Sequence, residues 1–161
     1  MADMMRAIRL TGPGGLETLA TSQVPVPEVE PGWVRIKVKA FGVNESEVTS
    51  RKGESGSDFT FPRILGIELA GIVDAVARGS RFHPGQQVVA MMGGMGRGID
   101  GSYAAYCLVP EEHVIRFSSD LPWEIIGALP ETFQTAYGSL TTGLGGWCRA
   151  GVPGRDLARR G

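Results

Sequence analysis

Apolar and polar residues alternate most regularly between residues 33 and 40. The apolar positions on one face of an extended chain are Val34, Ile36, Val38 and Ala40, and the intervening positions are Arg35, Lys37 and Lys39. A period of two with a charged face is typical of a β-strand that is buried on one side only. This segment therefore predicts a strand whose apolar face packs on the core and whose charged face meets solvent.

Shorter apolar runs, bounded by glycine and proline, predict the rest of the β-structure. The predicted strands cover residues 5–10, 68–76, 87–91, 102–109 and 113–117. Residues 23–31 contain three prolines, which favour an extended path at a sheet edge because proline cannot donate to a ladder. The first 120 residues are thus predicted to be mainly β.

Three segments predict helices: residues 44–51, 121–128 and 131–140. In the first, Glu47 and Arg51 have the i,i+4 spacing of a surface ion pair worth about 0.3 kcal/mol. In the last, four apolar residues share one face, at positions Phe133, Ala136, Tyr137 and Leu140. The order of elements is therefore mostly β, then α.

Composition narrows the class of protein. The 161 residues include 24 Gly and 10 Pro, which disfavours a helical bundle, and the formal net charge of −1 gives no basic field for nucleic acid. Neither a signal peptide nor an apolar run of membrane-spanning length is present, so a cytoplasmic protein with no membrane partner is predicted. Cys107 and Cys148 form neither a disulfide framework nor a Cys-x-x-Cys pair.

Five motifs in order resemble one family. They are Gly42-Val43-Asn44-x-x-Glu47-x-x-x-Arg51-x-Gly53, Leu65-Gly66-x-Glu68-x-x-Gly71-x-Val73, Gly85-x-x-Val88, Gly101-Ser102-Tyr103-Ala104-x-Tyr106 and Ala128-Leu129-Pro130-x(4)-Thr135-Ala136-Tyr137-x-x-Leu140. Together they resemble the zinc-independent quinone oxidoreductases of the medium-chain dehydrogenase/reductase superfamily.

The resemblance implies the domain organisation. Residues 1–128 are expected to form a GroES-like domain, a partly open β-barrel, and residues 129–142 the start of the helix leading to a cofactor domain. The Rossmann domain that the family supplies next has no counterpart here. Residues 143–161 are instead rich in Gly and Arg and are predicted to be a disordered tail. A chain of this length is not expected to form a complete two-domain enzyme.

The resemblance also implies a site without metal. The zinc-ligand positions of related alcohol dehydrogenases correspond to Asn44 and Ile67, and isoleucine cannot ligate. Asn44 is expected near the nicotinamide and substrate, with a helix cap as an equal alternative. Thr135 is expected near the nicotinamide carboxamide, with a bond to its own helix backbone as the alternative.

Four further residues are candidates for the site or its support. Glu68, on a strand among apolar residues, is expected to have a structural partner rather than a catalytic role. Glu47 is also assigned a structural role. By the resemblance, Arg51 is expected near the cofactor phosphates or the domain junction, with a surface pair with Glu47 as an equal alternative. Tyr103 is expected to share a strand face with Tyr106, as core or pocket wall.

Two functions remain open from the sequence. The first is the substrate-binding half of an NADPH-dependent quinone or enone oxidoreductase, which transfers hydride without zinc and binds NADPH weakly or not at all on its own. The second is a catalytically inactive barrel that acts as a binding or interaction module. A homodimer through the exposed apolar helix face around Phe133 and Tyr137 is a possible partner arrangement. The glycine loop 93–98 has no phosphate-binding motif.

Overall fold

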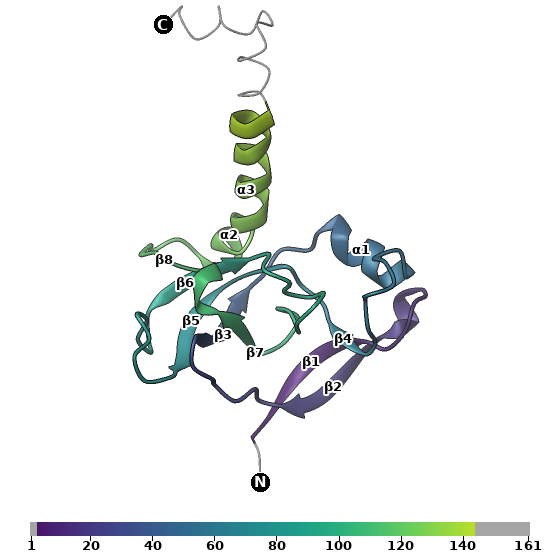
Figure 1. Cartoon of the computed structure of the whole chain (residues 1–161), viewed down its shortest axis with the longest axis horizontal. Coiled ribbons are helices and arrows are strands. Elements are labelled where there is room, and N and C mark those ends of the chain that lie inside the picture. The colour runs from purple at the N-terminus through teal and green to yellow at the C-terminus, as the bar shows by residue number, and fades with distance from the viewer. Residues whose placement is uncertain (1–2, 144–161) are drawn as a thin grey trace, which may run out of the picture.

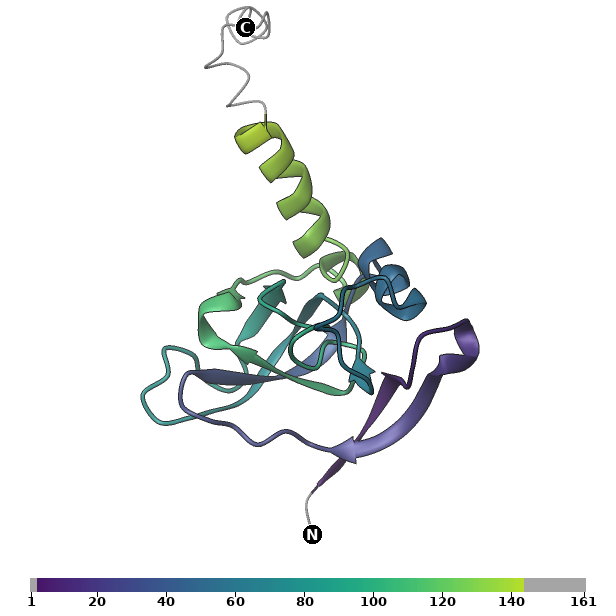
Figure 2. The same ribbon diagram turned by 45° about the vertical axis from the view of Figure 1, so that its right-hand side comes forward.

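A computed structural model describes residues 3–143, which form two antiparallel sheets and a projecting C-terminal helix (Figures 1 and 2). One sheet has the strand order β2-β1-β4 and the other the order β7-β3-β5-β6-β8. The strands are β1 (Met4–Leu10), β2 (Leu19–Pro25), β3 (Trp33–Ala40), β4 (Arg63–Ile64), β5 (Glu68–Val76), β6 (Gln87–Met91), β7 (Tyr106–Pro110) and β8 (Val114–Arg116). The helices are α1 (Glu45–Lys52), α2 (Trp123–Ile126) and α3 (Pro130–Gly138). The prediction of a mainly β, partly open barrel with C-terminal helices is confirmed.

The main core cluster is formed mainly by alternate residues on one face of the five-stranded sheet. Val34 and Ile36 of β3 have no exposed surface and belong to the same cluster as Leu69 of β5 and Val88 of β6. Lys37 and Lys39, on the other face of β3, are exposed. The alternation in the sequence therefore predicted this strand correctly. Each such buried aliphatic side chain contributes about 1.5–3 kcal/mol to folding.

Local sequence signals missed some elements. Strand β2 begins at Leu19, before the proline-rich segment, and pairs with β1 along its whole length. Strand β4 has only two residues, too few for any periodicity. The strand predicted at 102–109 begins at Tyr106, and α2 is shorter than the predicted helix 121–128. These boundaries depend on pairing partners that are distant in the sequence.

Two glycines of the segment 93–101, Gly96 and Gly101, pack closely against Gly66. A Cβ atom on Gly96 would lie 2.8 Å from the backbone of Gly66, and one on Gly101 would lie 2.2 Å from the Gly66 carbonyl oxygen. Met95, directly before Gly96, is 1% exposed and belongs to the core. The loop thus supports the segment that leads into β5.

Helix α3 projects away from the barrel in both views (Figures 1 and 2). A π-helical turn, Ser139–Gly143, extends it. The predicted Gly/Arg-rich tail at 143–161 lies, apart from Gly143, outside the described residues. Within residues 3–143, no helix is long and apolar enough to cross a membrane.

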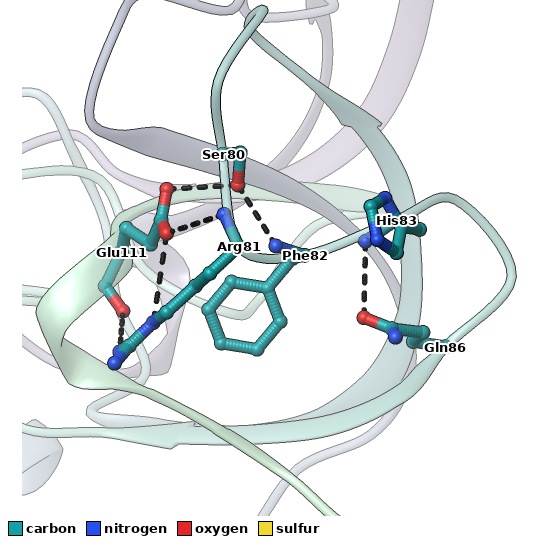
Figure 3. A network of polar contacts seen from close by, with 6 residues as sticks. All are labelled: Ser80, Arg81, Phe82, His83, Gln86 and Glu111. Carbon is teal, nitrogen blue, oxygen red and sulfur yellow. Dashed lines mark hydrogen bonds and ion pairs between the residues drawn. The ribbon is translucent and has the colours of Figure 1, made fainter.

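The turn between β5 and β6 is fastened to the 3-10 turn Glu111–His113 by the Glu111 carboxylate (Figure 3). The carboxylate accepts the Ser80 hydroxyl at 2.8 Å and the Arg81 N–H at 3.0 Å. The Ser80 hydroxyl oxygen in turn accepts the Phe82 N–H at 3.1 Å, and the Phe82 side chain is 4% exposed. One carboxylate therefore holds the turn that closes the core at this end.

This network predicts a pH-dependent effect of Glu111→Gln. The pKa of Glu111 lies below its ordinary value of 4.5 because its carboxylate accepts hydrogen bonds from the Arg81 N–H and the Ser80 hydroxyl. The nearby Arg81 guanidinium lowers the pKa further. Its stabilisation is therefore complete above that ordinary value and is lost as pH falls through the lowered value. We expect Glu111→Gln to destabilise the chain by about 1 kcal/mol at neutral pH. The difference should vanish at acid pH, as measured by urea unfolding.

The matched control is Glu30→Gln, which makes the same charge change on an exposed side chain that has no hydrogen bond or ion pair with any described residue. It should leave the urea midpoint unchanged at both pH values. An equal loss in the two variants would contradict a specific role for Glu111.

Candidate functional site

The residues that the motifs single out meet where α1 begins. Asn44 is the N-cap of α1, with an extended backbone (φ −116°, ψ 159°), and its N–H donates to the Glu47 carboxylate at 2.7 Å. This is the reciprocal half of a capping box, which satisfies a donor that the helix leaves free. Gly53 ends the helix in the left-handed conformation (φ 81°). The first turn of α1 is therefore set by its own sequence.

Glu47 is buried, and the predicted surface pair with Arg51 is wrong. Its side chain is 4% exposed, and its second oxygen accepts the Ile67 N–H at 3.0 Å. Burial raises the pKa of Glu47, although the two backbone donors oppose that rise. The sequence did not reveal this, because Ile67 is twenty residues away and offers only a backbone N–H.

Arg51 holds a different part of the chain. Its guanidinium donates to the Gly14 carbonyl oxygen, and its own carbonyl accepts the Gly14 N–H at 2.8 Å. The end of α1 is thereby joined to the loop after β1. The structure thus places this guanidinium on a backbone carbonyl rather than on Glu47.

Glu68 is the centre of the site. It is 1% exposed at the start of β5, and one carboxylate oxygen accepts the Asn44 side-chain N–H at 2.9 Å. The other oxygen accepts the backbone N–H of Glu131, in the first turn of α3, at 2.8 Å. Gly42 leaves the necessary space, since a Cβ there would lie 2.1 Å from the carboxylate. Glu68 thus connects the barrel with both α1 and α3.

Glu131 is a residue that the motif analysis missed. One oxygen of its carboxylate accepts the Thr135 hydroxyl at 2.7 Å, and the other is buried without a hydrogen-bond partner among the described residues. Thr135 itself is exposed on α3. The i,i+4 spacing of the two residues was the available signal. The network therefore brings Asn44 and Thr135 to the same corner through Glu68 and Glu131.

Tyr103 borders this corner. Its ring stacks on Phe41, with centroids 4.7 Å apart. Burial raises the pKa of Tyr103, and the charges of Glu47 and Glu68 raise it further, so the hydroxyl remains protonated. The expectation that Tyr103 and Tyr106 share a strand face is wrong, because β7 begins only at Tyr106, whose ring lies beside Arg35.

The site offers no set of metal ligands. Among the described residues, no group of three or more His, Cys, Asp or Glu side chains is arranged to hold a metal ion. Ile67 presents an apolar side chain that is 6% exposed, and the Asn44 amide is bound to Glu68. These two positions therefore supply structural contacts.

An apolar groove of about 570 Å³ lies beside α3. It is bordered by β6, β8, α2 and α3, and its wall is apolar except for Ser119 and Gln134. Phe133 and Tyr137 form the α3 side and are 66% and 70% exposed. The apolar face predicted for this helix is thus open to solvent.

Comparison with known proteins identifies relatives for most of the chain. The alcohol dehydrogenase GroES-like domain matches residues 30–119. The quinone oxidoreductase of Lama guanicoe is 34% identical over 139 residues, which are 85% of this chain and 41% of the relative. The mouse synaptic vesicle membrane protein VAT-1 homolog-like is 31% identical over 137 residues, 84% of this chain and 31% of the relative.

Solved structures agree with the sequence comparison. An NAD-dependent alcohol dehydrogenase superposes with a TM-score of 0.81 at 32% identity, over 88% of this chain and 48% of that one. A mycobacterial protein in complex with NADPH superposes with a TM-score of 0.71 at 27% identity, over 85% of this chain and 40% of that one. The chain thus spans less than half the length of these relatives.

The buried Glu47 carboxylate predicts a large effect of Glu47→Gln. Both of its partners are backbone N–H groups, which cannot turn round to accept a hydrogen bond from the new amide. One donor would therefore be left without an acceptor, at a cost of about 1–3 kcal/mol. We expect that loss in urea unfolding, together with faster hydrogen exchange at the Asn44 or Ile67 amide.

Glu45→Gln is the matched control, since it removes the same charge from an exposed position in the same helical turn. It should cost far less. If the two variants were equally stable, the proposed role of the Glu47 hydrogen bonds would be wrong.

Proposed function

The chain belongs to the alcohol dehydrogenase GroES-like domain family of the medium-chain oxidoreductases, and from this premise we propose that it is the substrate-binding half of an NADPH-dependent quinone or enone reductase. The observation that carries the proposal is the network Asn44–Glu68–Glu131–Thr135. The buried Glu68 carboxylate binds the Asn44 side chain and the Glu131 backbone N–H, and the half-buried Glu131 carboxylate binds the Thr135 hydroxyl, so Asn44 and Thr135 are held at one corner. The proposal includes a cytoplasmic location.

The donor and acceptor groups at this corner fit the nicotinamide end of the cofactor. The Thr135 hydroxyl is exposed, and its oxygen can accept a carboxamide N–H. The buried oxygen of Glu131 without a partner among the described residues is a second acceptor beside it. The sequence offers no glycine fingerprint for the phosphates. We therefore expect this chain to bind NADPH weakly.

The donor set also supports a reaction without zinc. Ile67 cannot coordinate a metal, and the Asn44 amide is bound to Glu68. NADPH, when bound, supplies a hydride to an already electrophilic carbon, as in a quinone or enone. The chain's own residues would orient the acceptor and exclude water. The ring of Tyr103, stacked on Phe41, would form part of the pocket wall.

Activity can be tested with the full chain by NADPH titration and by NADPH oxidation with 1,4-naphthoquinone, after subtraction of the rate without protein. We expect weak, saturable binding and measurable turnover. Thr135→Val should lower kcat/KM about tenfold, the equivalent of one lost hydrogen bond of about 1.4 kcal/mol. Thr132→Val, on the same helix and also exposed, should leave it unchanged.

A folded chain that neither binds NADPH nor oxidises it would contradict the proposed activity. Equal losses in the two threonine variants would contradict the role of Thr135.

The groove beside α3 supports the alternative, an interaction module, and we propose a second copy of this chain as its occupant. One helix supplies both a projecting apolar row, Phe133 and Tyr137, and one wall of the adjacent groove. A twofold axis can therefore place the row of each copy in the groove of the other. Such a contact would cover the apolar surface that a single copy leaves exposed.

The dimer is tested by light scattering across a range of protein concentrations. We expect the mass to rise from one copy to two with concentration, and Phe133→Glu to abolish the rise. Thr132→Glu adds the same charge to the same helix at a position outside the groove and should preserve it. A wild-type chain that stays monomeric throughout would contradict the proposal.

A further inference from the structure

A second cavity lies between the two sheets, with a volume of about 550 Å³. Its apolar wall comes from β1, β2, β3, β4 and β7, and includes the side chains of Met5, Val24, Trp33, Ile64, Tyr106 and Leu108. None of the residues of the Asn44–Glu68 corner borders it. Its volume falls in the range of about 300–1,000 Å³ that small-molecule sites occupy.

Two arginines lie on the wall of this cavity. The Arg63 side chain is only 16% exposed; one guanidinium nitrogen donates to the Thr60 hydroxyl at 2.8 Å and another lies 3.3 Å from Asp100. Its Nε atom is buried and has no hydrogen-bond partner among the described residues. Arg9 makes no side-chain hydrogen bond or ion pair with any residue that the structure describes. The cavity therefore contains guanidinium donors that the protein leaves unused.

The charges on the wall do not balance. Asp100 is the one carboxylate among the lining residues, and its Oδ1 already accepts the Ile64 N–H at 3.0 Å besides facing Arg63. Cys107, also on the wall, adds no charge, because burial raises the pKa of its thiol to about 12. Two guanidinium groups against one carboxylate leave one positive charge beside an apolar wall.

We propose that this cavity binds a flat, apolar carboxylate. The ring system of the ligand would pack against Trp33, Tyr106 and Met5, and its carboxylate would accept hydrogen bonds from Arg9 and Arg63. Arginine suits this task because its planar guanidinium can hold a carboxylate through two parallel hydrogen bonds. The proposal does not rest on the reductase activity, since the two sites share no residue.

The site is tested by isothermal titration of the full chain with 2-naphthoate and with the uncharged 2-naphthamide. We expect saturable binding of 2-naphthoate, and binding of the amide weaker by about tenfold, as one charged hydrogen bond accounts for. Arg9→Gln and Arg63→Gln should each weaken binding of the carboxylate and leave that of the amide nearly unchanged. If Arg63→Gln does not fold, Arg9→Gln still tests the proposal.

Arg6→Gln is the matched control. It removes the same charge from the same strand, at an exposed position that does not border the cavity. It should bind 2-naphthoate like the wild type. Absence of saturable binding, equal affinity for the two probes, or an equal loss in Arg6→Gln and Arg9→Gln would each overturn the proposal.

Discussion

Two buried carboxylates without a cationic partner hold this structure together at the corner where α1, β5 and α3 meet. Glu47 and Glu68 are almost fully buried, and each is satisfied by hydrogen-bond donors alone. A buried charge is costly unless such donors surround it. The donors come from the start of α1, the strand entry at Ile67 and the first turn of α3. The helices and the barrel are therefore positioned relative to one another by the need to solvate these two groups.

This constraint accounts for the residues at the two positions that resemble zinc-ligand positions. Asn44 can cap a helix with its backbone and solvate Glu68 with its side chain at the same time. Ile67 contributes only its backbone N–H to Glu47 and buries its side chain. The hydrogen bonds of these two residues therefore join α1 to the start of β5.

The sequence predicted features that depend on local order and missed those that depend on distant partners. The alternation of β3, the cap of α1 and the apolar face of α3 could be read from neighbouring residues, and each is present in the structure. The burial of Glu47 could not, since its spacing to Arg51 favours a surface pair while its real partner is the Ile67 backbone. Strand β4 was missed for the same reason, because two residues become a strand only by pairing with β1.

The close packing of the glycine loop limits the substitutions that this part of the protein can accept. Gly66, Gly96 and Gly101 lie so close together that a side chain on Gly96 or Gly101 would collide with the backbone of Gly66. The local shape can therefore be altered only by coordinated replacements, which arise rarely. On the exposed face of α3, by contrast, single exchanges meet solvent, so that part of the chain can vary without moving the backbone around Gly66.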